Sequence, residues 1–157
     1  MDKQIKTKPP ATKVRESSVG WMLKVLSTLL DAEMSKELKR WDLNLSQFAA
    51  LMSLSEKEGL TQAELGKKII MPGYATTRTL DALEEKHFVE RRRDERSRRS
   101  HRIFLTAQGR EIIPELFAIV KKVNEGLLSE LSATEKKQVS IILNKLVQTR
   151  LETARAL

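Results

Sequence analysis

The chain has 157 residues, of which 40% are hydrophobic and 32% charged, a composition typical of a globular protein that buries one core. It contains no cysteine, which excludes disulfides, thiolate metal sites and thiol redox sensing. The first fifteen residues carry no hydrophobic leader, and no apolar stretch approaches the ~18 residues of a membrane helix, so we expect a cytoplasmic protein without a membrane partner.

The net charge of +8 is concentrated in two segments. Residues 1–15 hold five Lys or Arg against one acid, and residues 86–102 hold eight against three, so the rest of the chain sums to −1. Local basic patches on a nearly neutral body are typical of proteins that bind nucleic acid. We expect residues 1–15 to form a flexible basic tail, whose role the sequence leaves open.

The apolar side chains of residues 19–41 recur mostly at steps of three and four, which predict one long amphipathic helix before the turn-like "DLNLS". The series is Val19, Met22, Leu23, Leu26, Leu29, Leu30, Met34, Leu38 and Trp41. A second apolar series, from Phe48 to Leu54, predicts another helix that ends before Gly59.

Two short helices are predicted next. "LTQAELGKKI" has Thr61 followed by Glu64 three residues later, a capping box that predicts a helix from about Gln62 to Ile69. Pro72 and Gly73 break this helix, and Pro is favoured in the first turn of the next one.

The second of these helices has two different faces. Thr76, Leu80 and Leu83 share one face and are expected to point inward, whereas the polar series Tyr74, Thr77, Arg78 and Asp81 faces away. Two short helices around a tight turn predict a helix-turn-helix, whose second helix presents polar side chains to the major groove.

The segments "FVERR" and "HRIFLT" are rich in Phe, Val and Ile and flank a polar stretch, so they predict a β-hairpin with an arginine-rich tip. A hairpin directly after a recognition helix is a wing. Because it is rigid, it can deliver arginines to a groove with less loss of conformational entropy than a tail.

Helices are predicted again over residues 107–157. Thr106 is a suitable N-cap, and "SATE", with Ser132 and Glu135, is a second capping box. The apolar faces of these helices are too large to stay in water. We expect them to pack against residues 16–45 and against a second copy of the chain in a two-fold dimer; the alternative is that they complete the core of a monomer.

The chain resembles the MarR family of bacterial transcription regulators over about residues 16–155. It contains "LTQAELGKKI" and then "TTRTLDALEEKHFVERRRDERSRRSHRIFLTAQGREI", where the family has "LTQAELA", "VTRLVDRLEEKGLVERR", "DRR" before a wing strand, and "LTEKGR" in the same order. The resemblance implies a dimeric winged-helix regulator that binds a pseudo-palindromic operator and releases it when a small, often phenolic or anionic, ligand binds.

The resemblance also implies site residues. Thr77 and Arg78 match the Thr-Arg of the family's recognition helix, and Arg99, in the wing's Arg-Arg pair, is expected to enter the narrow minor groove. The full set of expected DNA contacts is Gly73, Tyr74, Thr76, Thr77 and Arg78 in the recognition helix, and Arg96, Arg98, Arg99, His101 and Arg102 in the wing.

Three positions depart from the family pattern. Ser97 replaces a frequent Asp that pairs with a wing arginine, which leaves the conformation of the wing tip open. His87 replaces a frequent Gly, at a position where we expect a positive φ. The opening Pro72-Gly73-Tyr74 differs from the usual polar start of the recognition helix, so the preferred DNA sequence is not inherited from relatives.

In the family, effectors bind between the dimerisation helices and the DNA-binding lobe. Trp21, Trp41, Phe48 and Met52 are the apolar candidates for such a pocket, although their helical spacing makes them core residues first. Catalysis has no support, because the two histidines lie in or beside the wing and no nucleophile, carboxylate pair or phosphate loop has a recognisable spacing. We expect no metal or cofactor.

The sequence therefore predicts a mainly α fold with a small β-hairpin wing. Residues 16–157 form one domain, with dimerisation helices at 16–45 and 107–157 and a winged helix-turn-helix lobe at 46–106. The expected function is that of a homodimeric, sequence-specific repressor of transcription released by an aromatic or anionic ligand. Two alternatives stay open: an architectural DNA-binding protein without sequence preference, and a winged-helix adaptor for an acidic protein. The operator, the target genes, the effector and the sign of regulation do not follow from the sequence.

Overall fold

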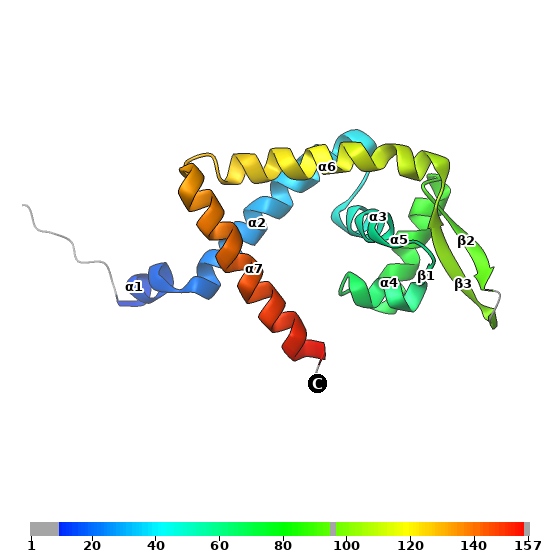
Figure 1. Ribbon diagram of the computed structural model, residues 1–157, viewed down its shortest axis with the longest axis horizontal. Coiled ribbons are helices and arrows are strands. Elements are labelled where there is room, and N and C mark those ends of the chain that lie inside the picture. Colours follow the sequence, from blue (N-terminus) through cyan, green and yellow to red (C-terminus); the bar gives the residue numbers. More distant parts are fainter. Residues whose placement is uncertain (1–9, 95–96, 156–157) are drawn as a thin grey trace, which may run out of the picture. The chain divides into compact units, whose positions relative to one another are not determined.

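A computed structural model describes residues 10–94 and 97–155, and of residues 97–99 and 151–155 it describes the backbone only (Figure 1). Its elements are α1 (Pro10–Ser17), α2 (Val19–Leu38), the 3-10 helix η1 (Lys39–Trp41), α3 (Leu45–Glu56), β1 (Leu60–Thr61), α4 (Gln62–Lys68), α5 (Gly73–Glu85), β2 (Val89–Asp94), β3 (Ser97–Leu105), α6 (Ala107–Leu127) and α7 (Ala133–Arg155). This mainly helical fold with one small antiparallel sheet confirms the predicted fold class. The chain divides into two compact units, of which the first ends at Val120 and the second begins at Lys121.

The structure has the long helix and, after it, the turn predicted at "DLNLS", but a break at Ser18 separates this helix from a short helix that was not predicted. Ser18 lies between α1 and α2 and caps α2, its hydroxyl accepting the Trp21 N–H at 3.2 Å. At the other end, Asp42 has a φ of 51°, a left-handed conformation that Asp tolerates well, and Asn44 opens α3 with a capping box. A Ser or Asn that bonds the local backbone favours a cap over a helix interior, which explains both breaks.

The prediction of a flexible tail through residue 15 is wrong for residues 10–15, which belong to α1. Pro10 occupies the first position of this helix, where the N–H that Pro lacks has no intrahelical partner. Residues 1–9 lie outside the described part of the chain.

The core of the first unit lies among α3, α4, α5, the sheet and the first half of α6. Its fully buried side chains include Leu51, Leu54, Leu65, Leu80, Leu83, Ile103, Leu116 and Ile119. Burying each such side chain contributes about 1.5–3 kcal/mol. The inward face of α5 is as predicted, because Thr76, Leu80 and Leu83 are all buried.

The sheet confirms the predicted hairpin and adds a strand that was not predicted. Its order is β1-β3-β2, all antiparallel, with Leu60 opposite Ile103 and Val89 opposite Leu105. The hairpin strands extend to Asp94 and from Ser97, with a register shift between Arg93 and Asp94. The two-residue strand β1 is too short to show alternation in the sequence.

All three predicted helix caps are present. Glu64 accepts the Thr61 N–H at 2.7 Å, and Glu135 accepts the Ser132 N–H at 2.8 Å. The backbone bond from Thr61, followed by its side-chain bond, lowers the pKa of Glu64, and the side-chain bond from Ser132 does the same to the pKa of Glu135. At the start of α6, Thr106 accepts the Gly109 N–H at 3.0 Å.

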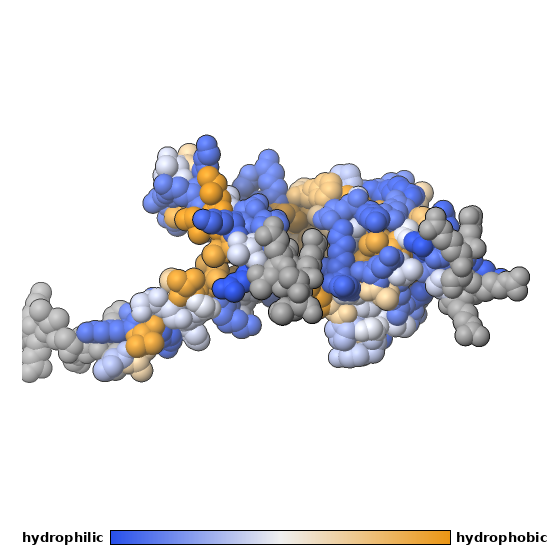
Figure 2. All heavy atoms as spheres, turned by 60° about the horizontal axis from the view of Figure 1, so that its bottom comes forward, coloured by the Kyte–Doolittle hydropathy of each residue, from blue (hydrophilic) through white to orange (hydrophobic). Residues whose placement is uncertain are grey.

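Figure 2 shows hydrophobic side chains, in orange, at the molecular surface. The exposed large apolar residues of α2 are Val19, Trp21, Met22, Leu23, Val25, Leu26 and Leu29, and those of α7 are Ile141, Ile142, Leu143, Leu146 and Val147. Within residues 10–94 and 97–155, no helix combines the length and apolar character that crossing a bilayer requires.

Candidate nucleic-acid interface

The helices α4 and α5 meet at a tight turn made by residues 69–72. The Met71 N–H donates to the Gly66 carbonyl at 2.8 Å, and Pro72 is the N-cap of α5. Gly66 allows the close approach, because a Cβ there would lie 2.7 Å from the Thr76 hydroxyl oxygen. This is the geometry of a helix-turn-helix.

The first turns of α5 present an open, polar face. Tyr74 is 73% exposed, Arg78 is exposed, and a Cβ built on Gly73 would meet no atom within 4 Å. Thr76 is 1% exposed, and its hydroxyl donates to the Pro72 carbonyl at 3.1 Å. The expected DNA contact by Thr76 is therefore wrong, because its side chain packs inward against α4.

Thr77 lies at the edge of this face and is held by a residue that sequence reasoning did not select. Its hydroxyl donates to the Gly73 carbonyl at 3.0 Å and accepts a hydrogen bond from the Gln62 amide nitrogen at 2.6 Å. Gln62 is the first residue of α4, so this bond joins the two helices at their exposed edge.

A pocket of about 320 Å³ lies beside the recognition helix, between α5 and the start of α3. Its wall includes Asn44, the N-cap of α3, with Ser46 and Gln47 of α3 and Tyr74 and Arg78 of α5. None of its lining residues is acidic, so the surface around Arg78 suits an anion such as a DNA phosphate.

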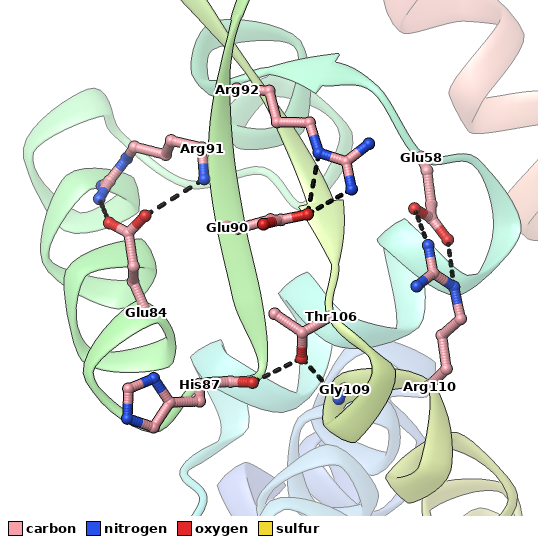
Figure 3. Close-up of polar contacts among 9 residues, drawn as sticks. All are labelled: Glu58, Glu84, His87, Glu90, Arg91, Arg92, Thr106, Gly109 and Arg110. Carbon is pink, nitrogen blue, oxygen red and sulfur yellow. Dashed lines mark hydrogen bonds and ion pairs between the residues drawn. The ribbon is translucent and has the colours of Figure 1, made fainter.

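Two arginines of the wing are neutralised by carboxylates (Figure 3). Arg91 pairs with Glu84 and, at 2.5 Å, with Asp81, which fastens β2 to α5. Arg92 donates to Glu90 and lies 4.5 Å from the centre of the Phe104 ring. The count of charges along the sequence does not show which arginines are neutralised. The partners of Arg91 lie on α5, and the partner of Arg92 lies two residues before it in β2.

The predicted wing residues have different outcomes. Arg102 is partly buried, pairs with Asp94 at 2.9 Å and donates to the Gly59 carbonyl at 2.7 Å, so its first role is to join β3 to the adjacent strands. His101 is exposed and stands opposite Arg93, which is also exposed and was not selected from the sequence. Arg98 and Arg99 lie in β3, but their side chains, like all of Arg96, fall outside the described residues.

The base of the wing is fixed by a side-chain bond to the backbone and by an ion pair (Figure 3). His87 has a φ of 58°, which confirms the predicted positive φ after α5. Thr106 donates to the His87 carbonyl at 2.5 Å, and Arg110 of α6 forms a two-pronged pair with Glu58 at 2.8 and 3.1 Å. These contacts hold the hairpin at a set angle to the helix-turn-helix.

The four residues expected to form a ligand pocket do not share one site within a chain. Trp21 lies in the first turn of α2 and is 46% exposed, and Trp41 ends η1. A separation of twenty helical residues places them about 30 Å apart. Trp41, Phe48 and Met52 are each partly buried. The indole nitrogen of Trp41 is buried and has no hydrogen-bond partner among the described residues.

Metal binding has no visible basis in the described part of the chain, where no three His, Asp or Glu side chains are grouped as ligands.

Comparisons with known proteins agree with this geometry. A family model described as "MarR family" matches residues 43–101. Over 131 residues the chain is 30% identical to the HTH-type transcriptional repressor Rv2887 of Mycobacterium tuberculosis, covering 83% of this chain and 94% of that protein. A crystal structure of Rv2887 in complex with salicylic acid superposes with a TM-score of 0.70 at 30% identity, covering 83% of this chain and 96% of that one.

Two further crystal structures are similar. A MarR transcriptional regulator from Methanosarcina mazei Go1 has a TM-score of 0.81 at 25% identity and covers 86% of this chain and 97% of that one. A mutant MarR from E. coli, solved with operator DNA, has a TM-score of 0.74 at 25% identity and covers 85% and 96%, respectively. With its winged helix-turn-helix and 30% identity across nearly all of a known repressor, the chain belongs to the MarR family of DNA-binding transcriptional regulators.

Proposed function

We propose that the chain is a sequence-specific repressor that binds a pseudo-palindromic operator as a homodimer. The observation that carries this proposal is the exposed start of α5, with Tyr74 and Arg78 open to solvent and followed in the chain by a hairpin wing. The repressor name of Rv2887 and the operator complex of the E. coli MarR mutant support it.

In this proposal each α5 enters a major groove. Arg78 is suited to the guanine edge or a phosphate, and Tyr74 to a base edge or a sugar. Each wing reaches the adjoining minor groove, where Arg99 would be attracted by the concentrated negative potential. Arg96, Arg98, His101 and the newly identified Arg93 add to the field along the phosphates.

The homodimer is supported by the apolar surfaces of α2 and α7. Seven large hydrophobic side chains of α2 are between 38% and 60% exposed, and α7 has five that are between 41% and 58% exposed. Such faces are costly in water and are covered by a second copy in two-fold dimers. We therefore assign dimerisation to residues 16–45 and 107–157 and DNA binding to residues 46–106.

Release by a small ligand is supported by Trp41. Its buried indole N–H has no partner among the described residues, and leaving a buried donor unsatisfied costs about 1–3 kcal/mol. A carboxylate or phenol oxygen would satisfy it, and the salicylic acid complex of Rv2887 supports this ligand class. Salicylate should quench tryptophan fluorescence and lower operator affinity over the same concentration range, and Trp41→Phe should remove both effects. Binding without any change in DNA affinity would contradict the sensing role.

The DNA function is tested by selecting bound duplexes from a random pool and measuring the affinities of the selected and scrambled DNA across a salt series. A palindromic sequence with half-sites ~10 bp apart, or a small multiple of that, and a preference of ~10³ or more is expected. Binding of all sequences alike would instead support an architectural DNA-binding protein.

The site assignment is tested by Arg78→Ala and Arg99→Ala. If the residue reads bases or groove shape, its loss should weaken the free energy of operator binding by roughly 1–3 kcal/mol. It should also relax the base preference at particular positions of the operator. A phosphate contact should weaken binding to all sequences and reduce the salt slope by about one.

A further inference from the structure

We propose that Gln62, on the helix before the recognition helix, is a specificity-determining residue of the DNA interface. It acts by fixing the hydroxyl group of Thr77, so that Thr77 accepts but does not donate a hydrogen bond at the DNA surface. This inference rests on the proposed function and extends it to a residue outside the recognition helix.

The hydrogen bonds of Thr77 determine what its hydroxyl can still do. A threonine hydroxyl has one hydrogen and two acceptor sites. The hydrogen is donated to the Gly73 carbonyl at 3.0 Å, and one acceptor site receives the Gln62 Nε2–H at 2.6 Å. One acceptor site and the methyl group remain for a base.

The single hydrogen of the Thr77 hydroxyl also fixes the orientation of the Gln62 amide. If its oxygen faced Thr77, the single hydroxyl hydrogen would have to serve both Gln62 and Gly73. Only the amide nitrogen satisfies both bonds at once. Gln62 and Thr77 therefore form a directional chain that ends on the backbone of α5.

The surroundings of Gln62 place it at the surface that the helix and the wing share. It lines a groove of about 280 Å³ together with Ser100 and His101 of β3. Thr77, its partner, lies one residue before the exposed Arg78. Gln62 thus lies between the two elements proposed to enter the grooves of DNA.

An acceptor and a methyl group define a base preference. The acceptor suits the amino group of adenine or cytosine in the major groove, and the methyl group suits the methyl of thymine. The guanine edge, which offers only acceptors there, gives Thr77 no partner. Without Gln62, only the bond to the Gly73 carbonyl orients the Thr77 hydroxyl. The hydroxyl can then exchange that single bond for one in which it donates to DNA, so the discrimination should weaken.

The test is a double-mutant cycle read out as base preference. Gln62→Met keeps the length of the side chain without its polar groups, and Thr77→Val keeps the shape without the hydroxyl. Each should lower the preference at the same position of each half-site, on the order of tenfold. The double variant should show no further loss, because both single changes remove one unit. Gln108→Met, on the exposed surface of α6, is the matched control and should leave the motif unchanged.

Three outcomes overturn the inference: an equal weakening for all sequences, losses that add in the double variant, or an unchanged motif. If the unaltered protein selects no motif, the proposed function fails together with the inference; a clear wild-type motif that Gln62→Met leaves intact overturns the inference alone. If thermal unfolding shows that Gln62→Met does not fold, Gln62→Ala is used. It also removes the hydrogen bond to Thr77, so the same preference should fall, and an unchanged preference overturns the inference.

Discussion

Gly109, near the start of α6, lies directly against the backbone carbonyl of Phe88. A Cβ on Gly109 would lie 1.9 Å from the Phe88 oxygen and 2.9 Å from its carbonyl carbon. The same oxygen accepts the Thr106 N–H at 3.1 Å. The entry into α6 and the exit from α5 are therefore packed backbone against backbone, at the base of the wing.

Gly109→Ala should destabilise the protein strongly. Its methyl group meets backbone atoms, which move only by displacing α6 or the start of β2, and overpacking of this kind costs about 1–3 kcal/mol or more. The measurement is the free energy of unfolding by chemical denaturation. Gly126→Ala, in the same helix with no atom within 4 Å of the added methyl, should instead stabilise by about 0.5–1 kcal/mol. Similar effects of the two changes would contradict the proposed packing at Gly109.

Ile70→Gly should raise the stability of the fold. Ile70 has a φ of 54°, where a left-handed conformation costs an ordinary side chain roughly 1–2 kcal/mol and a β-branched one is a true outlier. It is 86% exposed, so little burial is lost with the side chain. Glycine also gives the unfolded chain more conformational freedom, which offsets part of the relieved strain. The free energy of unfolding should therefore rise by about 1 kcal/mol or less in denaturation experiments. Ile70→Ala keeps the Cβ and should recover only part of the gain; a larger gain with Ala than with Gly would disprove the role of strain.

Local signals of the sequence were enough to predict most of the elements. The capping boxes at Thr61 and Ser132, the positive φ at His87 and the inward face of α5 all depend on residues a few positions apart, and all are present. The short helix before Ser18 was missed because Val14 is its only large apolar residue, which is too little to form a helical period.

The candidate site was less predictable because it depends on contacts between distant residues. Arg102 is tied to Gly59, forty-three positions away, and Gln62 to Thr77, fifteen away. Neither pairing has a periodic signature. Thr76 could have been excluded, since its position on the face of Leu80 already predicted burial.

The capping carboxylate of Glu64 should contribute a pH-dependent stability. Because its folded pKa lies below the ordinary value of 4.5, the charged form stabilises the folded state; this contribution is complete above that value and is lost as the pH falls through the lowered folded pKa. Glu64→Gln keeps an acceptor for Thr61 but does not titrate. The unfolding free energy of this variant should therefore fall less steeply than that of the wild type as the pH is lowered. Denaturation from about pH 6 to pH 3 measures this. Glu115→Gln, an exposed change in α6, controls for the loss of one charge, and equal acid slopes in wild type and Glu64→Gln would refute the prediction.

Arg91 and Arg93 are two residues apart in β2 but differ in their surroundings. The Arg91 side chain is 21% exposed and pairs with Asp81 and Glu84, whereas Arg93 is exposed and has no ion pair with any described residue. In a DNA complex, Arg93 therefore retains a full charge for phosphates, and Arg91 serves to join the wing to α5.

Substituting these two arginines by glutamine should separate stability from DNA binding. Arg91→Gln should lower the unfolding free energy by about 1 kcal/mol, since the partly exposed pairs are screened by solvent, and should leave the salt slope of DNA binding nearly unchanged. Arg93→Gln should change stability by less than about 0.5 kcal/mol and reduce the slope by about one, because one phosphate contact is lost. Denaturation and a salt titration of operator affinity on both variants give the comparison. A reduced slope for Arg91→Gln with an unchanged slope for Arg93→Gln would reverse the assignment.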